Sequence, residues 1–157
     1  DGCSLRLPGV LARPPARTGQ LSAFLSDMVR ELAAGRPCTC PMSAQATTWA
    51  SSLPCVLDNL LHAAGMRPAA LGGRRALTLP TLCFTMAELV DAIAKACGTD
   101  ARALVRYAPD ARIEALFGRF APLATPLADA AGFRHDGSLV QLVRRALAQA
   151  DSAGAAA

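Results

Sequence analysis

Apolar positions change their spacing several times along the first half of the chain, and each change predicts an element. A short alternating run at 4–7 predicts a strand that stops at Pro8-Gly9. From residue 21 the apolar spacing is helical, and Gly35 is expected to end that helix. A strand is expected at 47–53, and Pro54 suits the first turn of a helix that continues to Ala64. The segments 13–19 and 36–43 have the composition of loops.

The second half continues the alternation of strands and helices. A strand at 75–80 follows the Gly72-Gly73 turn, and Thr85 with Glu88 forms a capping box for a helix that Gly98 ends. Three further elements are expected: a strand at 104–107, a short helix at 112–117 and an amphipathic helix at 139–147. Strands that alternate with helices predict an α/β fold.

Composition excludes several classes of protein. Hydrophobic residues make up 52% of the 157 residues, which excludes disorder throughout. No apolar run reaches the ~18 residues of a membrane span, and no signal peptide is visible, so a cytoplasmic protein without a membrane partner is expected. The net charge is +4, but the arginines are scattered and aromatics are only 4%. No nucleic-acid partner is therefore expected.

The cysteine pattern favours reduced structural thiols over a disulfide scaffold or a metal site. The chain has six cysteines, but it is too long and apolar to depend on disulfides. Cys38 and Cys40 are separated by one residue, whereas zinc ligands usually pair across two to four residues. His62 and His135 have no ligand spacing to a cysteine pair, so no metal is expected.

Several segments together resemble the extended short-chain dehydrogenases, the NAD-dependent epimerase/dehydratase family. Residues 4–10, Ser-Leu-Arg-Leu-Pro-Gly-Val, followed by Arg13-Pro14, resemble the late Rossmann strand of that family. Later elements of the family are matched in order by 47–49, 55–63, 77–80 and 84–90. Residues 107–113 and 131–134 resemble one subgroup, the NAD-dependent D-erythronate dehydrogenases.

The resemblance implies the C-terminal part of a Rossmann-type NAD(P)-binding fold plus a small α/β substrate-binding domain. Residues 1–12 would be the late Rossmann strand, and 13–150 the substrate-binding domain, with a re-crossing segment near 47–65 and a disordered tail at 151–157. A strand so close to the first residue suggests that the chain enters partway through a larger sheet.

The two motifs that define the family's chemistry are missing from this sequence. No Gly-x-x-Gly-x-x-Gly follows a strand, and no Tyr-x-x-x-Lys occurs, because Tyr107 is followed by Ala111 at that spacing. The family uses that Tyr as the acid/base and the Lys to lower its pKa. We therefore expect no catalytic residue in this chain, and a half-enzyme that is inert without the missing N-terminal Rossmann half. The cofactor implied is NAD, with NADP not excluded because the residue that reads the ribose lies in the missing half.

The resemblance also implies site residues. Leu7, Pro8, Gly9 and Val10 lie where the family strand ends beside the nicotinamide, although Pro8 also suits a plain strand end. A guanidinium pairs well with the carboxylate of a small sugar acid, so Arg13 and then Arg112 are candidate substrate ligands, with ordinary solvated arginines as the alternative.

Two further residues are substrate-binding candidates, and one pair is expected to be structural. Ser22 begins the first long helix, where it could meet substrate oxygens or simply cap the helix. Trp49 could close over the substrate or fill the seam between domains. Asp58 and His62 lie four apart on a helix and could pair structurally.

The implied reaction is hydride transfer from a secondary alcohol carbon to NAD. For D-erythronate this is oxidation at C2 to the 2-keto acid, and the full enzyme is a possible homodimer. Two alternatives stay open: a portion of a nucleotide-sugar epimerase or dehydratase, and a free-standing binding module without catalysis. An exposed hydrophobic patch beside residues 4–10 would fit either a missing half or another partner.

Overall fold

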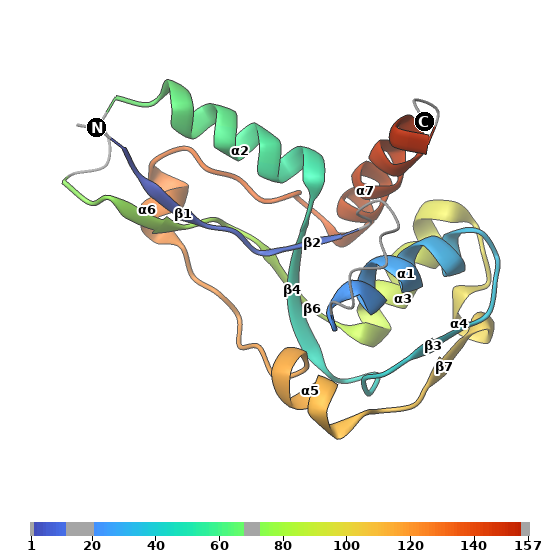
Figure 1. Cartoon of the computed structure of the whole chain (residues 1–157). Helices are drawn as coiled ribbons and strands as arrows, with labels where there is room; N and C mark the ends of the chain where they lie inside the picture. Colours follow the sequence, from blue (N-terminus) through green and yellow to red (C-terminus); the bar gives the residue numbers. More distant parts are fainter. Residues whose placement is uncertain (1, 12–20, 68–72, 155–157) are drawn as a thin grey trace.

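The computed structural model describes residues 2–11, 21–67 and 73–154, and it has the α/β fold expected from the sequence (Figure 1). Helices in chain order are α1 (Ala23–Ala33), α2 (Leu53–Gly65), α3 (Met86–Cys97), α4 (Ala101–Leu104), α5 (Ala111–Phe117), α6 (Pro126–Ala130) and α7 (Leu139–Gly154). Strands are β1 (Ser4–Arg6), β2 (Gly9–Leu11), β3 (Cys38–Cys40), β4 (Thr47–Ser52), β5 (Ala76–Thr78), β6 (Leu82–Thr85) and β7 (Val105–Tyr107). None of these helices combines the length and apolarity that a membrane crossing demands.

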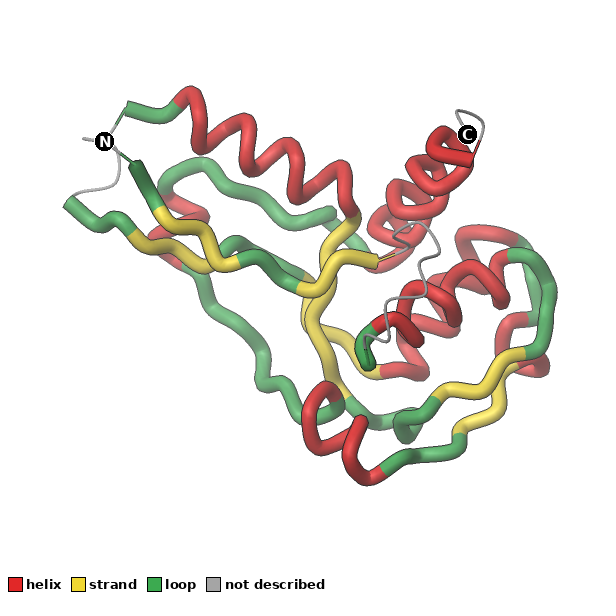
Figure 2. The backbone as a smooth tube through the Cα atoms, viewed as in Figure 1, coloured by secondary structure: helices red, strands yellow, loops and turns green. Residues whose placement is uncertain are grey.

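The strands form three small sheets among the described residues. β2 runs parallel to β4, which pairs antiparallel with β6 on its other side. β1 and β5 form a parallel pair, and so do β3 and β7. Figure 2 shows β1 and β2 as successive stretches of one path that crosses from the first pair to the larger sheet.

The first strand, β1, ends at Arg6 before Pro8-Gly9, as the sequence predicts, but a second strand that was not expected, β2, begins at Gly9. Pro8 lacks a backbone N–H and interrupts the ladder, and Gly9 starts β2 against Ala50. The change of partner explains the interruption, because β1 pairs with β5 before the proline and β2 pairs with β4 after it.

Two hydrophobic clusters lie on opposite sides of this crossing. The larger cluster is formed where α1, α3 and α7 pack against the sheet of β2, β4 and β6, with Leu32, Met86 and Leu142 fully buried. The smaller cluster lies between β5 and α6 and contains Leu79 and Phe133. Figure 1 shows β1, β5, α2 and α6 on one side of the molecule, and α1, α3 and α7 on the other.

Local signals placed several helix ends correctly. Thr85 and Glu88 form the predicted capping box of α3, and Gly98 ends the helix with φ of 71°. Ser52 caps α2 by accepting a hydrogen bond from the Cys55 N–H, with Pro54 in the first turn.

Other expectations need correction. The expected loop at 36–43 contains β3, whose partner β7 lies far away in sequence. β6 and α4 were not expected, and α7 continues to Gly154, past the expected start of the tail at 151. The expected loop at 13–19 and the last residues, 155–157, lie outside the described residues.

Candidate functional site at the β2–β4 corner

The segment expected to meet a cofactor is accessible at the junction of β1 and β2. Leu7 and Gly9 are exposed, and Pro8 and Val10 are half-buried. Gly9 and Val10 pair with Ala50 and Ser51 of β4. A side chain at position 9 would bring its Cβ to 3.1 Å from the Trp49 carbonyl oxygen, so the close approach of the two strands favours glycine there.

The predicted cofactor contacts can be compared with what the described residues offer a dinucleotide. Gly9 is exposed and Pro8 half-buried, so the turn between β1 and β2 is open to a flat ring. The described residues contain no glycine-rich turn leading from a strand into a helix, the arrangement that receives a pyrophosphate. Contact of Leu7–Val10 with a nicotinamide stays a prediction, and the described residues hold no site of this kind for the rest of a dinucleotide.

Two hydroxyl groups tie the neighbouring backbone together. Thr81 donates a hydrogen bond to the Ala50 carbonyl at 2.8 Å, and its hydroxyl lies 3.3 Å from that of Ser51. An open cavity of about 470 Å³ lies beside Thr81, with Pro80, Asp129 and His135 in its lining.

The four predicted substrate residues have different surroundings. Trp49 donates its indole N–H to the Ala121 carbonyl at 2.8 Å, and its ring lies 4.8 Å from that of Phe120. These contacts favour the seam-filling interpretation of Trp49. Ser22 stands at the start of α1, but its side chain accepts no capping hydrogen bond, so the simple-cap interpretation is not supported. Arg13 lies outside the described residues.

Arg112 lies at the far end of β4 from the predicted cofactor contacts. It is exposed at the start of α5, and α5 leads to Gly118, whose carbonyl accepts the Thr47 N–H at 2.9 Å. Thr47 begins β4, whereas Gly9 and Val10 pair beside its last residues. Figure 1 shows α5 well away from the β1–β2 junction. The structure brings Leu7–Val10 next to Trp49 and does not bring Arg112 to them.

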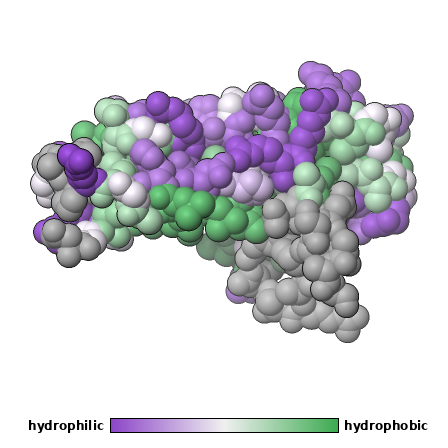
Figure 3. All heavy atoms as spheres, turned by 90° about the horizontal axis from the view of Figure 1, so that it is seen from above, coloured by the Kyte–Doolittle hydropathy of each residue, from purple (hydrophilic) through white to green (hydrophobic). Residues whose placement is uncertain are grey.

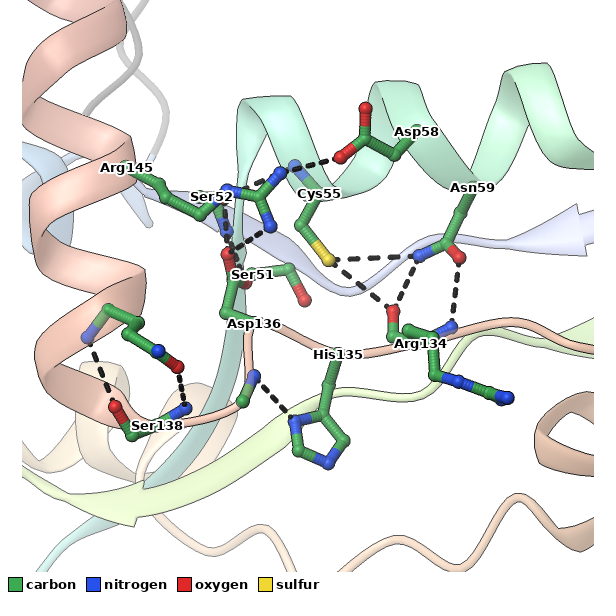
Figure 4. A network of polar contacts seen from close by, with 12 residues as sticks. Ser51, Ser52, Cys55, Asp58, Asn59, Arg134, His135, Asp136, Ser138 and Arg145 are labelled. Atoms are coloured by element: carbon green, nitrogen blue, oxygen red, sulfur yellow. Dashed lines mark hydrogen bonds and ion pairs between the residues drawn. The ribbon is translucent and has the colours of Figure 1, made fainter.

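A buried polar network at the end of β4 was not anticipated from the sequence (Figure 4). Asp136 accepts hydrogen bonds from the Ser52 N–H at 2.9 Å and from the Ser52 hydroxyl at 2.5 Å. Arg145 of α7 lies 3.6 Å from the same carboxylate and also pairs with Asp58 at 2.6 Å. The predicted Asp58–His62 pairing is therefore wrong, because Asp58 turns toward α7.

One face of α2 holds the segment 131–134 through polar groups. Asn59 both donates to the Arg134 carbonyl at 2.8 Å and accepts the Arg134 N–H at 3.1 Å. The Cys55 thiol donates to the same carbonyl, and His62 Nε2 lies 2.9 Å from the Ala131 carbonyl oxygen. Burial, together with the charge of Asp136, raises the pKa of the Cys55 thiol to about 12, which makes it a poor nucleophile.

With polar groups turned inward, α2 presents leucines to the outside. Leu57, Leu60 and Leu61 are 45%, 38% and 73% exposed, and Leu7 is 50% exposed. Figure 3 shows strongly hydrophobic residues gathered in one strip, with hydrophilic residues along one side of it. The exposed Leu7 agrees with the patch expected beside residues 4–10.

One feature of the sequence points to the polar contacts of α2. Cys55, Asn59 and His62 recur at helical spacing, but the leucines between them predict the opposite face as the buried one. Asp136 carried no motif. All six cysteines are free thiols, and no group of His, Cys, Asp and Glu that could hold a metal occurs among the described residues.

Comparisons with known proteins bear on the predicted family resemblance. No protein-family model matches the chain. It is 30% identical over 145 residues to the D-erythronate dehydrogenase of Cupriavidus necator, covering 92% of this chain and 45% of that protein. It is 29% identical over 98 residues to the D-erythronate dehydrogenase of Haemophilus influenzae, covering 62% of this chain and 31% of that protein. The chain thus spans less than half the length of the curated relatives it matches.

Solved structures share the fold over a similar portion. A nucleoside-diphosphate-sugar epimerase from Agrobacterium tumefaciens superposes with a TM-score of 0.81 at 29% identity, covering 91% of this chain and 42% of that one. An L-threonine dehydrogenase from Cupriavidus necator superposes with a TM-score of 0.76 at 22% identity, covering 94% of this chain and 52% of that one. The resemblance predicted from the sequence is therefore confirmed: the chain is similar in sequence to D-erythronate dehydrogenases and has the fold of about half of an epimerase-like short-chain dehydrogenase.

Proposed function

We propose that this chain is the C-terminal, substrate-binding portion of an NAD-dependent oxidoreductase that acts on a small sugar acid. The observation that carries the proposal is the similarity to a D-erythronate dehydrogenase across 92% of the chain. The substrate proposed is D-erythronate, oxidised at C2. The C2–H hydride passes to NAD, the hydroxyl proton leaves to a base, and the product is the 2-keto acid.

The base and most of the cofactor site are proposed to lie in an N-terminal Rossmann half. Leu7–Val10 would contribute backbone beside the nicotinamide, and Arg13 would meet the substrate carboxylate. The outward leucines of α2 and the exposed Leu7 support this arrangement, because exposed apolar surface of this kind is usually covered by another part of a protein.

The direct test is a comparison of the full-length enzyme with this chain alone. We expect the full-length enzyme to form NADH when given D-erythronate and NAD, and the chain alone to form none. Carbon NMR of the product would place the new carbonyl at C2. Absence of NADH formation by the full-length enzyme, at any D-erythronate concentration, would reject the proposed substrate.

A second function is favoured by the epimerase from Agrobacterium tumefaciens, which superposes with a TM-score of 0.81. An epimerase or dehydratase would interconvert nucleotide sugars without net NADH release. Incubation of the full-length enzyme with nucleoside-diphosphate sugars, followed by chromatography, separates the two functions. The intact mass of the native gene product tests the third possibility, a free-standing binding module.

A further inference from the structure

The carboxylate of Asp136 is completely withdrawn from solvent. Its side chain is 0% exposed, and both oxygens accept hydrogen bonds from a single residue, Ser52. The Arg145 guanidinium, 3.6 Å away, supplies the nearest opposite charge. A buried carboxylate is tolerated only where such partners compensate for the lost hydration. The arrangement therefore fixes Ser52 in both its backbone and its side chain.

Ser52 occupies the point where three elements meet. It is the last residue of β4 and the N-cap of α2, and its register partner in β2 is Leu11. The Ser52 hydroxyl accepts the Cys55 N–H while it donates to Asp136. Helix capping needs only the accepting role, so the bond to Asp136 adds a constraint that the cap does not require.

That constraint acts on the segment expected to face the nicotinamide. Gly9, Val10 and Leu11 are aligned with Ala50, Ser51 and Ser52, so the position of Ser52 sets where β2 lies. Gly9, at the start of this aligned strand, is exposed.

We propose that Asp136 is a positioning residue, which acts through Ser52 to hold β2 in the register that the nicotinamide end of the cofactor requires. This inference rests on the proposed function for its kinetic consequence, but not for its structural one. A displacement of about 1 Å at a reacting centre slows a reaction by up to a hundredfold, so a loosened β2 should slow C2–H cleavage.

The kinetic test uses the full-length enzyme with Asp136→Asn, and with Glu114→Gln as the matched control. Glu114 also accepts the N–H and hydroxyl of one serine, Ser43, but at the other end of β4. The concentration of intact sites is measured by NADH binding, and kcat is calculated per intact site. We expect Asp136→Asn to lower this kcat by about tenfold. We also expect it to raise the deuterium isotope effect on kcat with C2-deuterated D-erythronate. Glu114→Gln should leave both within about twofold.

A structural measurement does not depend on the substrate. Hydrogen exchange of the backbone amides should accelerate at 9–11 and 50–53 in Asp136→Asn, and stay unchanged at 86–97 in α3. If the wild-type enzyme forms no NADH from D-erythronate, the proposed function fails and hydrogen exchange alone decides the positioning role.

The inference is overturned by either of two results. One is unchanged exchange at 9–11 in folded Asp136→Asn. The other is a kcat that equals the wild-type value once the enzyme concentration is taken as the concentration of sites that bind NADH, together with an unchanged isotope effect. If Asp136→Asn does not fold, Ser52→Ala replaces it, because that variant keeps the backbone N–H bond to Asp136 and loses the hydroxyl bond, together with the cap on the Cys55 N–H. It should show the same changes at smaller amplitude.

Discussion

The two ends of β4 are held by the same chemistry in different surroundings. At the amino end, in the turn four residues before Thr47 begins β4, Glu114 accepts the Ser43 N–H at 2.9 Å and the Ser43 hydroxyl at 2.8 Å. At the carboxyl end, Asp136 accepts the same two groups of Ser52, with a side chain that is 0% exposed. Water can replace a lost partner at the half-buried first site, but not at the second.

The difference shows how burial changes the consequence of an identical bond pattern. A half-buried carboxylate adds little, because its groups have alternative partners in solvent. Removal of the buried carboxylate leaves the Ser52 N–H without its partner and takes from the Ser52 hydroxyl its acceptor, while Arg145 keeps only its pairing with Asp58. The corner beside the predicted cofactor contacts is therefore expected to be the less tolerant end of β4.

The largest expected effect comes from removing the buried carboxylate. Asp136→Ala should lower the free energy of unfolding by about 3 kcal/mol, because Ser52 and Arg145 lose their shared partner. Urea unfolding followed by circular dichroism measures this change. Glu114→Ala should cost clearly less, and equal losses for the two variants would contradict the comparison.

A smaller effect is expected where β2 approaches β4. Gly9→Ala would place a Cβ at 3.1 Å from the Trp49 carbonyl oxygen, and the strands must separate to admit it. We expect a loss of about 1.5 kcal/mol in the free energy of unfolding. Gly2→Ala is the control, because a Cβ there meets nothing within 4 Å. An unchanged stability of Gly9→Ala would show that the corner yields easily.

The hydrogen bonds between Glu114 and Ser43 should affect how the free energy of unfolding depends on pH. Hydrogen bonds from the Ser43 N–H and hydroxyl hold the pKa of Glu114 below its usual value. Because the folded-state pKa of Glu114 is lowered, its hydrogen bonds with Ser43 stabilise the folded protein fully above the unfolded pKa of about 4.3. This stabilisation is lost as the pH falls through the folded-state pKa.

Unfolding curves between about pH 3 and pH 6 test this sign. Glu114→Gln should flatten that part of the profile, since the neutral amide does not titrate. A steeper profile in the variant would show that the carboxylate is not stabilised by Ser43.

The smallest expected effect concerns chemical labelling of Cys55, which lies beside Asp136 at the start of α2. With a pKa of about 12, the Cys55 thiol should react with iodoacetamide near pH 8 at least about a hundredfold more slowly than the exposed Cys3. Mass spectrometry of peptides after timed labelling gives both rates. Comparable rates would mean that the start of α2 opens readily to solvent.

The sequence allowed prediction of features that depend on neighbouring residues. The capping box of Thr85 and Glu88 and the helix end at Gly98 are local, and both are confirmed. The strand expected at 104–107 is confirmed as β7, but its partner β3 lies more than sixty positions away and is too short to show a recognisable period.

The buried face of α2 could not be predicted from the sequence, because it also depends on residues far away in the chain. Helical periodicity favours burial of Leu57, Leu60 and Leu61, yet the structure buries Cys55, Val56 and Asn59 instead. What selects that face is the backbone of 131–134, which no pattern within the helix reveals. Asp136 was missed because its partner Ser52 is 84 residues away.

The direct passage from β4 into α2 leaves no spare residue to absorb a change in chain length. β4 ends at Ser52 and α2 begins at Leu53. Insertion of one residue after the cap would rotate the helix by about 100°, which would swing Asn59 away from Arg134 and bring a leucine toward it. Insertions and deletions accepted during evolution should therefore spare this junction and gather in connections such as 122–124, which lies between the residues bonded to β4 and the start of α6.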